Sequence, residues 1–167
     1  MRPLYIRRGF LHTAFLGTSL CTALCLLSCG EPLTQIVLRV DSDIPTTDVG
    51  RILVNVRGPS GVLAVDYSTD FGGPGSPDGF PITLGLLLAD DAVGEMVSVE
   101  VVANEVAGSE RVEVSAETNF VIGSSRELVL RLDSVCLEIP CGTGETCSEG
   151  VCITNQIDGE SLPEFAE

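Results

Sequence analysis

The chain of 167 residues contains no tryptophan and no lysine, so arginine supplies all nine of its basic side chains. Its only histidine is His12, close to the N-terminus. Histidine is the commonest general base near neutral pH and the commonest metal ligand, and histidine and lysine are the usual activating partners of a serine nucleophile. Their scarcity narrows enzymatic chemistry to carboxylates, and no pair of acids stands out as the pair of a glycoside hydrolase. We therefore expect a non-catalytic protein that needs no cofactor.

Basic residues are also few in relation to acidic ones. The sequence holds 24 Asp and Glu residues against nine Arg residues, which gives a formal net charge of -15. Such a surface repels nucleic-acid backbones and anionic lipid head groups, so we do not expect nucleic acid as a partner. An acidic surface is compatible with divalent cations or basic partners, although its simplest role is solubility.

The first 28 residues have the organisation of an export signal. Basic residues precede an apolar stretch over 10–27, and Ser28 and Cys29 follow it. This is the order of segments in a secretory signal, in which cleavage occurs after a small residue. The alternative is an uncleaved transmembrane helix, because the stretch is long enough to span a bilayer, but His12 and several Thr and Ser residues dilute it.

Leu26-Leu27-Ser28-Cys29 resembles the lipobox of bacterial lipoproteins. The resemblance implies that residues 1–28 are removed, that Cys29 carries diacylglycerol, and that its new amine takes a further acyl chain. Several acyl chains on one residue give stable membrane attachment, whereas a single chain is marginal. Gly30 is not the aspartate that retains enteric lipoproteins at the inner membrane, so the resemblance favours the outer membrane. We thus expect a cell-envelope protein that is anchored in a membrane through Cys29 and a short tether over 29–34.

Two export routes stay open. Arg7-Arg8-Gly9-Phe10-Leu11 resembles the core of the twin-arginine motif, in which two arginines and any residue precede Phe-Leu. Ile6 stands where that motif usually has Ser or Thr, and His12 stands where it usually has Lys. The alternative is an ordinary Sec signal that contains two adjacent arginines.

Residues 35–135 have the alternating pattern of an all-β domain. Valine is abundant there, and no segment has the periodicity of an amphipathic helix. Short alternating runs separated by Gly, Pro, Asp and Asn predict an antiparallel β-sandwich of about seven strands. The expected strands are Gln35–Ser42, Arg51–Arg57, Val62–Tyr67, Pro81–Ala89 and three runs over 97–102, 112–117 and 128–133. The layout resembles immunoglobulin-like or fibronectin type III-like domains, although the Cys…Trp…Cys signature of immunoglobulin domains is missing.

Four cysteines lie beyond the export signal and the lipidation site. They are spaced C-x4-C-x5-C-x4-C over 136–152. An even number of clustered cysteines in an exported chain predicts two disulfides, and four cysteines allow three pairings. Small knots of this kind usually cross, which favours Cys136–Cys147 together with Cys141–Cys152. The alternative is a zinc site, but cysteine knuckles for zinc are usually spaced C-x2–4-C.

The stretch CLEIPCGTGETCSEGVC resembles the EGF-like, cysteine-rich tails that follow β domains in many secreted bacterial proteins. We expect a separate module over 136–153, held together by its bridges because so short a segment has almost no core. The sandwich should then keep its fold when the bridges are reduced. Residues 154–167 are acidic and are expected to form a disordered tail.

Calcium binding is an alternative function, because calcium needs oxygen ligands and no histidine. The candidate ligands lie near two expected strand ends and are Asp41, Asp43 and Asp48 at one end, and Asp90 and Asp91, close to Glu95, at the other. Neither group has the glycine and distal glutamate of a calcium loop, so solvated turn acids are the simpler interpretation and no metal site is assigned. The leading expectation is a non-catalytic structural or recognition module with a protein or glycan partner. The alternative is a calcium- or carbohydrate-binding surface module.

Overall fold

A computed structural model describes residues 33–71, 77–87, 94–106 and 111–166. These residues are all-β, with two short 3₁₀ turns and no α-helix among them. Within these ranges, no helix is both long and apolar enough to cross a membrane. The export signal and Cys29 lie outside the described residues, so cleavage and lipidation stay predictions.

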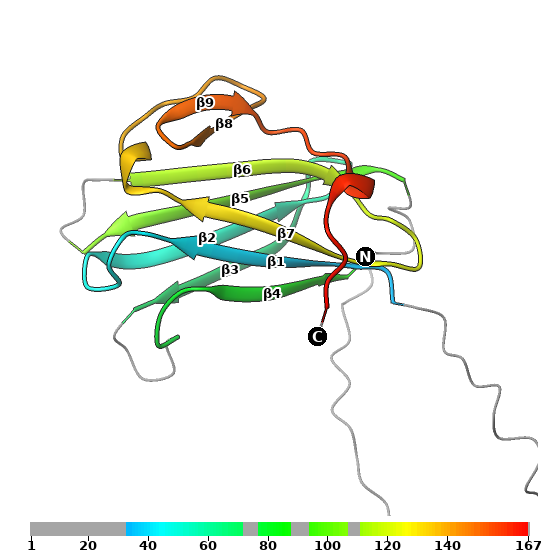
Figure 1. Ribbon diagram of the computed structural model, residues 1–167, viewed down its shortest axis with the longest axis horizontal. Helices are drawn as coiled ribbons and strands as arrows, with labels where there is room; N and C mark the ends of the chain where they lie inside the picture. Colours follow the sequence, from blue (N-terminus) through cyan, green and yellow to red (C-terminus); the bar gives the residue numbers. More distant parts are fainter. Residues whose placement is uncertain (1–32, 72–76, 88–93, 107–110, 167) are drawn as a thin grey trace, which may run out of the picture. The chain divides into compact units, whose positions relative to one another are not determined.

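Seven strands form two sheets that pack face to face (Figure 1). One sheet has the order β4-β1-β7, and the other has the order β3-β2-β5-β6. The strands are β1 (Gln35–Ser42), β2 (Val49–Arg57), β3 (Leu63–Asp70), β4 (Ile82–Leu87), β5 (Met96–Glu105), β6 (Arg111–Asn119) and β7 (Ser125–Leu132). The fold class expected from the alternation is confirmed.

Alternation directs one face of each strand into the core. Ile36, Leu38 and Val40 of β1 are fully buried, whereas Arg39 and Asp41 of the same strand are partly exposed. Successive side chains of a strand point to opposite faces, so apolar residues at every second position build one shared interior. Each fully buried Val, Leu or Ile stabilises the fold by about 1.5–3 kcal/mol relative to an exposed one.

The strand order differs from that of an immunoglobulin domain. β1 and β7 run parallel, with Gln35 opposite Ser125, whereas the other strand pairs that the structure describes are antiparallel. In a constant-type immunoglobulin domain the first strand shares a sheet with the second, fifth and fourth. Here the first strand pairs with the fourth and seventh, and the second pairs with the third and fifth. The strand order therefore gives no support to the immunoglobulin-like resemblance, because alternation reports which face is buried and not which strands pair.

The cysteine-rich segment packs along β6 (Figure 1). It contains η1 (Ser134–Cys136) and a hairpin of β8 (Glu145–Ser148) and β9 (Val151–Thr154). Disulfides join Cys136 to Cys147 and Cys141 to Cys152, which is the crossed pairing favoured by the sequence.

One of the two bridges belongs to the core of the sandwich. Cys136 and Cys147 are 2% and 3% exposed and lie in the same buried cluster as Leu132. The expected boundary between residues 135 and 136 therefore does not separate two cores. We expected a sandwich core that contains no cysteine, whereas the structure places Cys136 and Cys147 in it. Alternation along the strands does not show which segment outside the strands packs onto the core.

The residues after β9 pair with the edge of β6. The N–H of Glu117 donates to the carbonyl of Asn155 at 2.8 Å, and the N–H of Ile157 donates to the carbonyl of Glu117 at 2.9 Å. These bonds occupy backbone groups of an edge strand that would otherwise face solvent.

Farther along, η2 (Gly159–Ser161) leads the chain to the edge of β7. The N–H of Glu127 donates to the carbonyl of Pro163 at 2.9 Å, and the N–H of Phe165 donates to the carbonyl of Ser125 at 2.9 Å. Residues 154–166 thus line the edges of both sheets and are not the disordered tail expected from their acidity. Amino-acid composition does not predict this edge pairing, because backbone groups make the hydrogen bonds.

Candidate functional site

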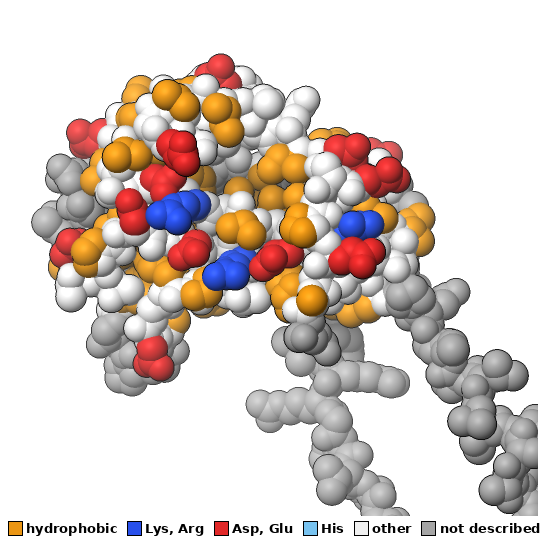
Figure 2. Space-filling view, in the orientation of Figure 1, with side chains coloured by type: hydrophobic (Ala, Val, Ile, Leu, Met, Phe, Trp, Pro, Cys, Tyr) orange, Lys and Arg blue, Asp and Glu red, His pale blue; other side chains and the backbone are white. Residues whose placement is uncertain are grey.

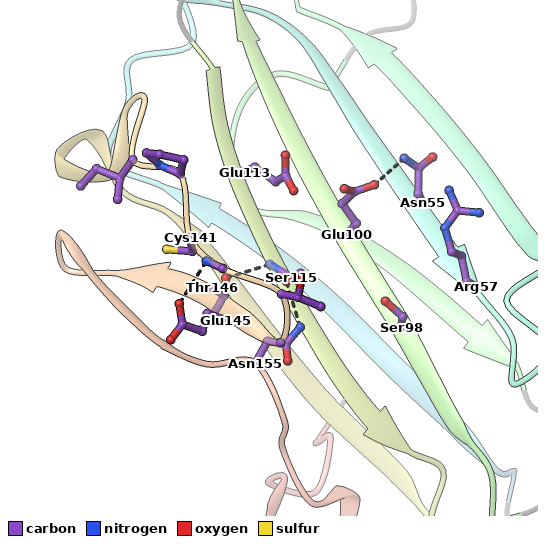
Figure 3. A pocket seen from close by; sticks show the side chains of 15 residues that line it. Asn55, Arg57, Ser98, Glu100, Glu113, Ser115, Cys141, Glu145, Thr146 and Asn155 are labelled. Atoms are coloured by element: carbon purple, nitrogen blue, oxygen red, sulfur yellow. Dashed lines mark hydrogen bonds between the residues drawn. The ribbon is translucent and has the colours of Figure 1, made fainter.

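A groove lies between the outer face of the β3-β2-β5-β6 sheet and the chain that leads into β8 (Figure 3). Its volume is ≈ 480 Å³. β2, β5 and β6 form its floor, and residues 139–146 form its wall. The wall segment packs along β6, the edge strand, so outward side chains of β2 and β5 stay open beside it.

The floor is polar and follows directly from strand register. Asn55 of β2 lies opposite Glu100 of β5, and Glu100 lies opposite Ser115 of β6. One row away, Arg57 lies opposite Ser98. Asn55 Nδ2 donates a hydrogen bond to Glu100 Oε2 at 3.0 Å, which orients that carboxylate. These are the outward positions of strands whose alternate residues fill the core.

Hydrogen bonds tie the wall to the floor. Thr146 Oγ1 accepts from the N–H of Ser115 at 2.9 Å, and Asn155 Nδ2 donates to Ser115 Oγ at 3.2 Å. Asn155 is 6% exposed, and its Oδ1 has no hydrogen-bond partner within the described part of the chain. A buried acceptor without a partner carries a desolvation cost that a donor can relieve. At the rim, Glu145 Oε2 accepts from the N–H of Gly142 at 3.0 Å.

The groove is acidic. Glu100, Glu113 and Glu145 line it, and Arg57 is the one basic residue among the described residues of the lining. Figure 3 shows Glu100 and Glu113 on neighbouring strands of the floor and Glu145 on the wall. Arg57 Nη1 donates to the carbonyl of Gly61 at 3.5 Å, in the turn after β2. The excess of carboxylates attracts cationic groups, and the described residues of the lining include no aromatic ring.

A second hollow, of ≈ 700 Å³, lies on the β7 side of the cysteine-rich segment. Val129, Val135 and Ile153 are exposed along it, beside the hydrogen-bonded pair Arg131 and Asp133. It differs from the groove in having an apolar wall next to a neutralised ion pair.

The acids considered as calcium ligands at the β1–β2 turn have other partners. Asp43 accepts from the N–H and the hydroxyl of Ser134, at 2.6 and 3.1 Å. Asp48 accepts from Thr47 Oγ1 at 3.0 Å. Across the described ranges, no three His, Cys, Asp or Glu residues come together in a way that suits a metal ion. Asp90 and Asp91 lie outside the described residues, and Glu95 is exposed just before β5.

Arginine and acidic side chains lie next to one another on the outer face of the β4-β1-β7 sheet (Figure 2). Arg131 donates to Asp133, and this hydrogen bond is the main reason why the pKa of the Arg131 guanidinium is raised. The charges of Asp43 and Asp41 raise it further. Asp41 also lies 3.8 Å from Arg39. Guanidinium groups thus partly balance the charge of Asp41 and Asp43, two of the acids considered as alternative calcium ligands.

Sequence patterns did not point to the groove. Glu100, Glu113 and Ser115 occupy the polar positions of alternating strands, where solvated side chains are the ordinary expectation. These side chains line a groove only because residues 139–155 run back along β6. No residue spacing in the sequence predicts that this segment returns there. All four cysteines of the segment are in disulfides, which leaves none as a zinc ligand. Comparison with known proteins found no matching family, no similar curated protein and no similar solved structure.

Proposed function

We propose that this chain is a lipid-anchored protein of the cell envelope and that its β-sandwich is a non-catalytic recognition module. The anchor rests on Leu26-Leu27-Ser28-Cys29. Two disulfides support a location outside the cytoplasm, because such bonds are rare where thiols are kept reduced. β1 begins at Gln35, so only a short tether connects the anchor to the folded part.

The acidic groove is the observation that carries the recognition role. Its volume lies within the range of ligand pockets. Three glutamates of the lining supply negative charge and hydrogen-bond acceptors. A partner that supplies positive charge and N–H donors complements this lining. We therefore assign the groove to an extended polypeptide segment that carries Arg or Lys. A neutral glycan is the weaker match, because the lining has no aromatic ring.

No reaction is assigned to the groove. The chain has no lysine, the described residues of the lining include no histidine, and Cys141 is held in a disulfide. A nucleophile there would have no activating partner of the usual kind. Binding without turnover is the function that these side chains support.

The anchor is tested by the Cys29→Ala variant expressed in a Gram-negative host. The variant should keep residues 1–28 and carry no acyl chains, because the acylated cysteine defines the cleavage point. Cys25→Ala is the matched control, since it leaves Leu26–Cys29 intact and should mature normally. Intact mass distinguishes the forms. A Cys29→Ala protein with the same acylated mass as the control would refute the anchor.

Recognition is tested by titrating the purified lipoprotein in detergent with an arginine-rich hexapeptide, while amide NMR signals are followed. Signals of Ser98, Ser115 and Thr146 should shift. Glu100→Gln and Glu145→Gln should each weaken binding by about two- to fivefold, the value of one partly exposed charge pair. Glu127→Gln, on the other sheet, is the control and should bind like the wild type.

Two results would count against this assignment. Shifts that leave the groove unaffected would show that the peptide binds the acidic surface non-specifically. Shifts at the groove with a neutral oligosaccharide, and none with the peptide, would replace the cationic partner by a glycan.

A further inference from the structure

The two ends of the sandwich differ in how much apolar surface they expose. Eleven large hydrophobic side chains are exposed within the described ranges, and six of them lie at the end where β1 begins, which we call the tether end. Their exposed fractions run from 40% to 68%. The six are Leu33, Val62, Leu63, Leu87, Met96 and Ile122. Of the other five, Val106 and Val135 lie toward the opposite end, so the tether end exposes the larger share of these side chains.

Strand register brings these residues to the same end (Figure 1). Leu87, the last residue of β4, lies opposite Gln35, the first residue of β1. Met96, the first residue of β5, lies opposite Asn119, the last residue of β6. The others lie in the segments that begin β1 or connect strands there, which are Leu33 before β1, Val62 and Leu63 between β2 and β3, and Ile122 between β6 and β7.

The chain N-terminal to β1 keeps this end close to the lipid anchor. This inference rests on the proposed function, which makes Cys29 the acylated residue. Thr34 is fixed to the sandwich, because its Oγ1 accepts from the N–H of Gly123 at 2.8 Å. Gln35 continues this attachment by donating its N–H to the carbonyl of Ser124 at 3.1 Å. Five residue steps separate Thr34 from Cys29, and an extended chain of that length spans at most about 17 Å.

We propose that the tether end rests on the bilayer surface and inserts its exposed apolar side chains among the lipid head groups. The free energy falls when apolar side chains leave water. Residues that a short tether holds close to an acylated cysteine stay near the membrane interface. Exposed acids at the same end, such as Glu95 and Glu160, disfavour anionic lipid. The lipid contacted is therefore zwitterionic. The strands then stand away from the membrane, and the groove opens to the side.

The test uses the mature lipoprotein in nanodiscs of phosphatidylcholine and phosphatidylethanolamine that contain a lipid with a gadolinium-labelled head group. Methyl NMR signals of Leu87, Met96 and Ile122 should be broadened several-fold more than those of Val106 and Val135. The last two are matched controls, because they are 68% and 60% exposed and lie toward the opposite end.

A second measurement uses the Leu87→Ser, Ile122→Ser double variant, with Val106→Ser as its control. The double variant should lose most of the broadening at Met96, while the control should keep it. Equal broadening at both ends, or no effect of the double variant, would overturn the inference.

The anchor itself is checked separately in the same samples. Protein that lacks the acyl mass and stays outside the nanodiscs would refute the proposed function. Protein that is acylated and bound to nanodiscs, but has no broadening at the tether end, would refute this inference alone. Contacts between two copies of the chain at the tether end, in place of broadening by the labelled lipid, would also overturn it.

Discussion

Gly159 is a position where one added carbon atom should have a large effect. The residue is buried in η2, and its N–H donates to Asn119 Oδ1 at 3.1 Å. A Cβ atom there would overlap the carbonyl oxygen of Asn119 and lie 3.1 Å from its carbonyl carbon. Both atoms belong to the backbone, so no side-chain rotation relieves the clash. The Gly159→Ala variant must separate the two chain segments by more than about 1 Å to reach an ordinary contact distance.

The cost of this separation follows from what the segments hold together. Extra atoms in a packed region cost about 1–3 kcal/mol, and contact with backbone places this case near the upper value. Releasing the tail instead would lose the burial of Leu162, worth about 2 kcal/mol, and hydrogen bonds worth about 1 kcal/mol each. We expect a loss of about 3 kcal/mol in the free energy of unfolding, or roughly 10 °C in melting temperature for a domain of this size.

Urea unfolding gives the free energy, and amide hydrogen exchange identifies the site. Protection should fall first at the N–H groups of Glu127 and Phe165, which bond across the β7 edge. Gly85→Ala is the control, because a Cβ on that β4 residue meets nothing within 4 Å. Alanine there should be neutral or should stabilise by up to about 1 kcal/mol. The reasoning fails if Gly159→Ala unfolds at the urea concentration of the control and keeps both amides protected.

Three further predictions concern the bridges, one core hydroxyl and one ion pair. Each bridge spans a sequence separation of 11 and stabilises the fold by about 3 kcal/mol, because it restricts the unfolded chain. Replacing both cysteines of the buried Cys136–Cys147 bridge by Ala should cost about 1–2 kcal/mol more than the same change at Cys141–Cys152, because packing is also lost. Urea unfolding of the two double variants measures this difference. Thr118→Val should stabilise by about 1 kcal/mol in the same assay, because the Thr118 hydroxyl is buried without a hydrogen-bond partner among the described residues, and a melting temperature below wild type would contradict this. The hydrogen bond from Arg51 lowers the pKa of Asp70 below its ordinary value of 3.8, so NMR titration should show that pKa rising in Arg51→Gln. Because the folded pKa is the lower one, the stability that the pair contributes is complete above the unfolded pKa and is lost as pH falls through the folded pKa.

Local pattern located the strands because burial alternates residue by residue. Gln35–Ser42 was predicted with the bounds that β1 has, since Ile36, Leu38 and Val40 mark one face without reference to any partner. Ends were less accurate where a strand runs past its apolar residues, as β3 does to Asp70. The crossed disulfides were also predictable, because four clustered cysteines leave few choices.

Long-range pairing was beyond the same reasoning. Nothing in the residues of β7 shows that its neighbour is β1 and that the pair is parallel. Asn155 and Pro163 accept hydrogen bonds through their backbone carbonyl groups, which every residue has. Their roles at the two sheet edges therefore cannot be predicted from residue type. The groove depends on the pairing at β6, because its wall exists only when the chain after β7 returns along that strand. A site that forms only when a distant segment packs against a sheet can therefore be found only once the fold is known.

The parallel pairing of β1 with β7 determines when the chain can complete its fold. Gln35 and Ser125 are neighbours in the sheet but are 90 residues apart in the chain. Contacts of such long sequence separation slow folding, because a long loop must close before they form. β1 therefore has no partner on its β7 side until nearly all strands exist. A chain that is made from its N-terminus therefore has no complete β4-β1-β7 sheet until β7 exists, and ordering of β1 waits for residues of the C-terminal third.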